Sequence, residues 1–374
     1  MADSAYGLLG IAGWMTIRAT GAMPLKGLPP QIWHGHEMLF GFAGAAIAGF
    51  LLTAVPSWTG ARGFAGWPLM VLTALWLGGR AAFASAAHLP ALAVAVLELS
   101  FLPALAAMVA VPLLRARNRN TPLLGVLAAL WFVDATFMYA LARGELVLAS
   151  TMLRVGIDIV LLLITVIGGR IVPAFTANAL RRRGIDAPLR NSHWVDAAAI
   201  GAMVLVVVID LLAPAHNLAA PAAGAAAVAH AIRLAGWRTS RTFSEPIVWV
   251  LHLAYAWLPL GLALKAVHLI SGAAWAADWM HALTIGVAAT MVVGVITRAS
   301  LGHTGREIVA SRWVAAAYGM LGGAALIRTG ATLATACREW FIWASGILWI
   351  AAFAVLLLVY GPILLRARVD GRED

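Results

Sequence analysis

Long apolar stretches, separated by short polar or proline-containing segments, make up most of the sequence. A helix needs about 20 mostly apolar residues to cross a bilayer, and about twelve stretches approach that length. Prolines, glycines and arginine clusters separate most of them, as at Pro29-Pro30, Arg115–Arg119 and Gly302–Gly305. The pattern predicts an all-α, polytopic transmembrane helical bundle that forms a single transmembrane domain over residues 1–374. The predicted spans cover residues 5–21, 37–56, 66–87, 89–114, 121–141, 147–169, 193–213, 216–236, 246–270, 273–297, 310–333 and 339–365.

The composition agrees with this pattern. The chain is 62% hydrophobic and 11% charged, whereas soluble domains are roughly 45–50% apolar and about 25% charged. A soluble core cannot absorb this excess, so we expect much of the apolar surface to face lipid. The 16 tryptophans fit the same interpretation, because tryptophan is enriched where the bilayer meets water.

The net charge of +10 does not indicate a nucleic-acid partner, because the arginines are spread over short connections between apolar stretches. Basic connections stay on the cytoplasmic side of a membrane. The even-numbered connections and the C-terminus hold most of these residues, while the odd-numbered ones hold fewer, among them Arg80 and Lys265. This distribution predicts that both termini are cytoplasmic. The single cysteine, Cys337, excludes an internal disulfide, a thiolate zinc site and a protein-ligated iron–sulfur cluster.

Histidines near the predicted outer ends of the spans are candidate metal ligands, since imidazole binds haem iron, copper and zinc. His34 and His36 lie in the motif Trp33-His-Gly-His-Glu-Met38, and His268 and His281 belong to the ninth and tenth spans. In a helix His34 and His36 point about 200° apart, whereas in an extended segment they share a side and can hold one metal. The alternative is that these residues anchor helix ends at the interface. For the clustered motif we favour metal binding.

A second group lies near the predicted inner ends. It contains His252, about two turns into the ninth span, and His303 in a Gly-His-Thr-Gly-Arg motif. Arg170, Arg298 and Arg306 are close in the predicted topology. An arginine fork binds carboxylates, so these residues are candidate partners of haem propionates or of another anionic ligand. Their alternative role is to orient the spans.

Three acids, Glu98, Asp134 and Asp158, fall inside predicted spans. Ionisable groups there are costly and suggest function, but proton transfer and simple hydrogen bonding between helices fit them equally. His88, His193, His216 and His230 lack motif surroundings, and we interpret them as interfacial or packing residues. We expect no internal repeat at a fixed period, and a relationship between two halves of the chain stays open.

Several of these segments together resemble the NnrS family of bacterial membrane proteins. They are Trp33–Gly41, Gly49–Gly60, Gly168–Thr176, Trp249–Gly261, His281–Gly286 and Thr297–Arg306. The resemblance implies a multi-pass protein of the bacterial inner membrane, with twelve helices, that contains haem and copper. It also implies a link to denitrification and to nitric oxide stress. One departure is the fifth span, which reads Asp134-Ala-Thr-Phe-Met138 where an asparagine and a histidine are expected.

On this resemblance the candidate metal ligands are the histidines inside matching motifs, while His268 lies outside one. We expect the haem to be of the b type, because the chain has no Cys-x-x-Cys-His motif. The candidate ligands are His34, His36, His252, His281 and His303, with His268 as a further candidate, and the expected cofactor-binding neighbours are Trp33, Glu37, Tyr255, Arg170, Arg298 and Arg306.

The leading functional hypothesis is a haem- and copper-binding protein that binds or turns over nitric oxide or another small diatomic ligand. Turnover would make it a nitric oxide-directed oxidoreductase and would require an electron donor protein or a quinol. One alternative is a membrane transporter of a metal ion, haem or a small anion, which needs a site near the bilayer midplane. Another is a factor that delivers metal or haem to a partner enzyme.

Overall fold

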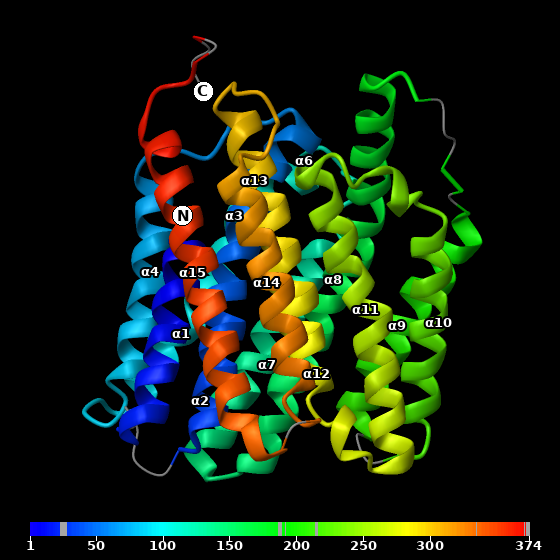
Figure 1. Cartoon of the computed structure of the whole chain (residues 1–374). Coiled ribbons are helices and arrows are strands. Elements are labelled where there is room, and N and C mark those ends of the chain that lie inside the picture. Colours follow the sequence, from blue (N-terminus) through cyan, green and yellow to red (C-terminus); the bar gives the residue numbers. More distant parts are fainter. Residues whose placement is uncertain are drawn as a thin grey trace. The chain divides into compact units, whose positions relative to one another are not determined.

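The computed structural model describes residues 1–22, 28–185, 189–190, 192–213, 216–333, 335–369 and 371. Every regular element assigned in these ranges is a helix, which confirms the predicted all-α class. The chain forms two compact units, the first made of Ala2–Ile159 and the second beginning at Val160. Helix α8 (Leu146–Arg182) contributes residues to both (Figure 1). That the whole chain is a single transmembrane domain stays a prediction.

The first unit is built around a long helical segment whose middle is a π-helix. This segment joins α2 (Pro30–His36), η1 (Glu37–Ala43) and α3 (Gly44–Thr59). The π-helix η1 packs against α1 and α4, and the indole nitrogen of Trp76 donates a hydrogen bond of 3.1 Å to the Gly41 carbonyl. The other helices are α1 (Ala2–Thr20), α4 (Trp67–Ala84), α5 (Ala91–Leu99), α6 (Phe101–Arg115) and α7 (Leu123–Arg143).

In the second unit α11 (Pro246–Ser271) is the central helix, because it packs against α10, η4, α13 and α14. Its inward residues, such as Leu251 and Leu258, are fully buried. The π-helix η4 (Ala282–Ala289) lies between α12 (Trp279–His281) and α13 (Thr290–His303). The remaining elements are α9 (His193–Leu212), α10 (Ala219–Ala235), η2 (Thr239–Arg241), η3 (Ala274–Ala276), α14 (Arg312–Gly330), η5 (Thr335–Cys337) and α15 (Arg338–Leu365).

Nine helical segments in the described part of the chain are long and apolar enough to cross a membrane, which supports a multi-pass protein. The other three predicted spans, over residues 5–21, 216–236 and 310–333, are also helical, as α1, α10 and α14. Helix α10 is apolar but shorter, and α1 and α14 are not among the nine. The number of twelve spans and the cytoplasmic position of both termini therefore stay predictions.

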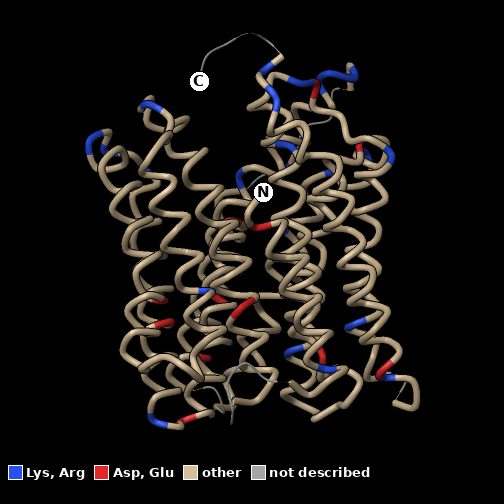
Figure 2. Tube along the Cα trace, turned by 90° about the vertical axis from the view of Figure 1, so that its left-hand side faces the viewer, with Lys and Arg blue, Asp and Glu red and all other residues tan. Residues whose placement is uncertain are grey.

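Charged residues gather mainly at helix ends, and only a few lie part-way along the helices (Figure 2). Arg80 and Lys265 were counted with the odd-numbered connections, although both fall inside predicted spans. Arg80 lies inside α4 with 7% of its surface exposed, and Lys265 lies inside α11. Lys265 pairs with Asp210 of α9. Neither residue counts toward the charge of a connecting loop, because each lies inside a helix.

Candidate metal centre

The side chain of His36 is completely buried at the point where α2 becomes the π-helix η1. π-Helices are rare and occur mostly at functional sites. Aromatic rings enclose the imidazole: the ring centroids of Phe83 and Phe137 lie 4.1 and 4.6 Å away, and that of Phe40 lies 5.0 Å away. This packing fixes the ring plane and leaves its two nitrogens to polar partners.

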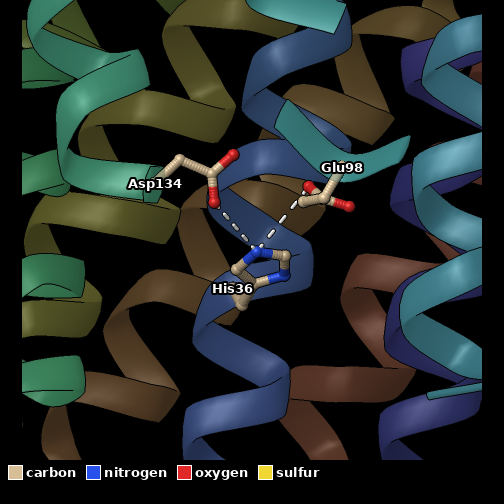
Figure 3. A group of neighbouring side chains, drawn as sticks. All are labelled: His36, Glu98 and Asp134. Atoms are coloured by element: carbon tan, nitrogen blue, oxygen red, sulfur yellow. Dashed lines mark hydrogen bonds and ion pairs between the residues drawn. The ribbon is translucent and has the colours of Figure 1, made fainter. Parts of the chain in front are cut away.

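Two carboxylates from other helices meet His36 Nε2. Asp134 Oδ1 of α7 lies 3.3 Å from this nitrogen, and Glu98 Oε1 of α5 lies 3.7 Å from it (Figure 3). The three ligand atoms lie within 4.8 Å of one another. Within the described ranges this is the one group of three histidine, cysteine or acidic side chains with such a spacing. A metal ion at this point would contact all three.

The opposite nitrogen of the ring, Nδ1, faces a third carboxylate. Glu37 Oε1 lies 3.1 Å from His36 Nδ1 and 2.5 Å from Arg80 Nη1. The Tyr6 hydroxyl of α1 donates to the other Glu37 oxygen, and Arg80 also pairs with Glu98. A carboxylate at one imidazole nitrogen is the usual companion of a metal at the other, because it fixes the tautomer and the ring orientation.

This cluster buries more acidic side chains than basic ones. Glu37, Glu98 and Asp134 are 2–4% exposed, while Arg80 is the one arginine that faces them in the described contacts. Buried carboxylates are costly unless they are paired, protonated or bound to a metal. The second oxygen of Glu98 is buried and has no hydrogen-bond partner in the described part of the chain. The cluster therefore has the charge and the unsatisfied oxygen that a bound cation would compensate.

A small cavity adjoins the cluster. Arg80, Glu98 and Asp134 form its polar wall, and apolar side chains close the rest, namely Phe40, Trp76, Phe101 and Leu102. A metal ion here would sit among apolar walls, where an electrostatic interaction is stronger than in water.

The protein-family model described as NnrS protein matches residues 1–368. The chain belongs to the NnrS family. A search of curated proteins found no match. The NnrS match includes every motif that carried the resemblance, from Trp33–Gly41 to Thr297–Arg306.

Of the NnrS motif residues in the first unit, His36 and Glu37 belong to the cluster, and His34 and Trp33 have other surroundings. The motif is helical, so His34 and His36 point to different sides. The His34 ring stacks on Trp14 with centroids 4.5 Å apart. Trp33 is buried, and its ring lies against Gly13.

In the second unit of the NnrS chain, both ring nitrogens of His252 are occupied by hydroxyl groups. Thr176 Oγ1 lies 2.8 Å from Nε2, and Thr239 Oγ1 lies 2.9 Å from Nδ1. Tyr255, one helical turn on, bonds through its hydroxyl to His230 Nδ1 at 2.7 Å and accepts from Arg233 at 3.1 Å. A metal bound to His252 would displace one of the two threonines.

The other predicted ligands of this unit lie near its helix ends. His268 Nδ1 is 3.2 Å from the Ala273 carbonyl. His281 Nδ1 lies 3.9 Å from Asp278 Oδ1. His303 is exposed, and its carbonyl accepts a hydrogen bond from Arg368. None of them belongs to a group of three metal-ligating side chains in the described ranges, so their ligand roles stay predictions.

The three predicted anion-binding arginines are also dispersed. The Arg298 guanidinium carbon lies 3.9 Å from the centre of the Phe175 ring. Arg306 donates to the Thr304 carbonyl at 3.4 Å, and Arg170 is exposed. A role of these residues in binding propionates stays a prediction.

Sequence reasoning singled out four members of the cluster but did not bring them together. Glu98 and Asp134 stood out as acids inside apolar spans, but nothing in the sequence paired them with His36. Tyr6 and Arg80 were not considered, although an ionisable residue within an apolar span is a usable signal. Asp134 occupies the segment that departs from the expected family pattern. Met138, which lies in the same departing segment, is also buried in α7, four residues after Asp134.

Proposed function

We propose that this NnrS-family protein binds a redox-active metal ion at the cluster of His36, Glu98 and Asp134, and that it binds or turns over nitric oxide with the help of a haem. The proposal is supported above all by one observation: an imidazole and two carboxylates lie close together and buried inside an apolar helical unit. The cellular setting that follows is the bacterial inner membrane during denitrification or nitrosative stress.

Copper is compatible with this donor set in its oxidised state. Imidazole suits copper, zinc and iron, whereas carboxylates suit harder ions, and Cu(II) accepts nitrogen and oxygen ligands together. No cysteine thiolate, one of the soft ligands that Cu(I) prefers, belongs to the group. The lone cysteine, Cys337, is exposed in the second unit. The same donors also fit Fe(II) or Zn(II), so a metal analysis must identify the ion.

The surroundings of the cluster suit a redox-active ion. Glu37 holds the imidazole through Nδ1, and Arg80 and Tyr6 hold Glu37 in turn. The bound metal would supply the electron chemistry, while these side chains keep its ligands in place.

A second candidate function is transport of a metal ion. It is favoured by one observation: the cluster lies inside the helices of one unit rather than in a connecting loop (Figure 3). A transporter must release its ion to both sides of the membrane, whereas a cofactor site retains it. Uptake of copper, iron or zinc by vesicles that contain the purified protein distinguishes the two functions.

The proposed function is tested on purified protein in detergent or lipid. We expect copper and iron in defined ratio to protein, a Soret band that shifts between the oxidised and reduced states, and a further shift when nitric oxide is added. A His36→Ala variant loses the non-haem metal, and His193→Ala, which changes an exposed histidine, retains it. Absence of bound metal and haem from the wild-type protein contradicts the proposal.

A further inference from the structure

The helical segment that begins at His36 recurs later in the chain. Residues 281–305 align with residues 36–60 without a gap, 245 positions further on. The segment occurs twice in the chain and not at a fixed short period, so it is not a periodic repeat. The identical positions are His36 and His281, Gly41 and Gly286, Ala43 and Ala288, Gly49 and Gly294, Ala54 and Ala299, Thr59 and Thr304, and Gly60 and Gly305.

The backbone follows the same course in both copies. The π-helix η1 begins directly after His36, and the π-helix η4 begins directly after His281. Gly60 ends the first segment with a φ of 67°, and Gly305 lies in the turn after the second with a φ of 71°. Two π-helices at equivalent positions are not expected by chance, because this conformation is rare.

Each copy also packs in the same way against the helix that precedes it. A methyl group on Gly41 would collide with the ring of Tyr6 in α1, and one on Gly286 would collide with the ring of Trp257 in α11. In both cases the aromatic ring occupies the space that the missing side chain leaves beside the π-helix.

A second contact follows at the same spacing. Gly10 comes four residues after Tyr6, and Gly261 comes four residues after Trp257. Gly10 lies against the side chain of Met38, and Gly261 lies against that of Leu283. Met38 and Leu283 are equivalent positions, two residues after the respective histidines. The repeated module is therefore a pair of helices in contact.

The surroundings of the histidine are repeated as well. In the first copy, Nδ1 of His36 faces the carboxylate of Glu37, which is held by Arg80 of the following helix, α4. The carboxylate favours the tautomer with a proton on Nδ1, so that Nε2 carries the lone pair that a metal requires.

In the second copy, Nδ1 of His281 lies 3.9 Å from Asp278, which is held at 2.7 Å by Arg328 of the following helix, α14. Asp278 precedes its histidine by three residues, whereas Glu37 follows its own by one. Counted from the histidine, these positions are four residues apart, which is about one helical turn, and Asp278 is the residue that caps the start of α12. In both copies an arginine-held carboxylate thus lies on the Nδ1 side of the histidine, at hydrogen-bond distance in the first copy and at the longer distance of an ion pair in the second.

The two copies differ on the side of Nε2. Glu98 and Asp134 complete the first site, whereas the described residues bring no comparable pair of acids to His281. A metal ion that depends on protein ligands alone would find too few of them at His281. A haem iron already has four porphyrin nitrogens and needs only one further ligand from the protein. We propose that His281 is an axial ligand of the haem, so that the two copies of the module hold different cofactors.

An unsatisfied donor near the second copy supports this assignment. In the first copy the Tyr6 hydroxyl donates to Glu37. The equivalent position in the second copy is Ala282, which has no carboxylate to offer to Trp257. The indole nitrogen of Trp257 is buried and has no hydrogen-bond partner in the described part of the chain, and the residue is 7% exposed. A polar atom of a bound group would satisfy this donor.

This inference rests on the proposed function, and its test separates the two. Haem content, Soret absorption and non-haem metal are measured on the purified full-length protein with His281→Gly, His36→Gly or His193→Gly. We expect His281→Gly to lose haem and to retain the non-haem metal, and His36→Gly to show the opposite. Imidazole added to His281→Gly during haem loading should restore the Soret band, which a misfolded protein would not do.

The other possible outcomes show which of the two proposals fails. A wild-type protein without haem and without metal overturns both proposals. If the wild type contains haem and His281→Gly keeps the full amount, only the present inference is overturned. If His281→Gly loses haem but imidazole does not restore it, His281 is not an axial ligand. A wild type that contains the metal but no haem also overturns the inference and leaves the first site in place.

Discussion

Arg80 Nη1 lies 2.5 Å from Glu37 Oε1, and the same guanidinium pairs with Glu98. One cation therefore joins the acid beside His36 Nδ1 to an acid beside His36 Nε2. Because the four side chains are almost completely buried, removal of any one changes the electrostatic balance of the others.

The first prediction concerns stability. Arg80→Met leaves buried carboxylates without their counter-ion, and removal of one partner of a buried pair costs about 3–5 kcal/mol. We expect a clear loss of thermal stability in lipid or detergent. Arg182→Met is the control, because its pair with Glu245 is 51% exposed on the arginine side and such pairs contribute roughly 0–1 kcal/mol. Equal effects of the two substitutions would show that the buried pairing of Arg80 does not stabilise the fold.

The second prediction separates metal binding from folding. Asp134→Asn keeps the shape of the side chain and removes one of three clustered negative charges. Metal affinity should fall by at least tenfold, while the metal-free protein should unfold at an equal or higher temperature because repulsion within the cluster decreases. Metal titration and calorimetry of the chelated protein measure the two quantities. Unchanged metal affinity in Asp134→Asn would exclude this carboxylate as a ligand.

The apolar pattern was sufficient to predict the class and the position of the helices, because apolar length is what a membrane span requires. The motif around His36 was also predicted as a ligand segment. Its partners were not, because Glu98 and Asp134 come from helices far along the sequence and only tertiary packing brings them to Nε2. Arg80 falls inside the predicted span 66–87, but its pairing with Glu37 and Glu98 depends on the same tertiary packing.

The third prediction concerns the repeated packing. Gly41→Ala and Gly286→Ala each place a methyl group against an aromatic ring, and such overpacking costs about 1–3 kcal/mol. Gly49→Ala is the matched control, because nothing lies within 4 Å of its added carbon. Thermal unfolding should show a loss for the first two and little change for the third. A loss for only one of the two would argue against equivalent packing in the two copies.

The fourth prediction concerns His252. Its ring bonds to Thr176 and Thr239, so His252→Ala leaves one buried and one part-buried hydroxyl group with one partner fewer each. Loss of such a buried partner costs about 1–3 kcal/mol. We expect lower stability with unchanged metal and haem content. If His252→Ala loses a cofactor, the histidine is a ligand and one threonine bond must break when the cofactor binds.

In the proposed centre, His36, Glu98 and Asp134 together bind a metal ion. X-ray absorption at the edge of the metal that His36→Ala loses tests it most directly, because the method counts and identifies the ligand atoms. We predict a shell of nitrogen and oxygen at about 2.0–2.2 Å, with one imidazole and no sulfur. A sulfur shell near 2.3 Å, or two or more imidazoles, would contradict it.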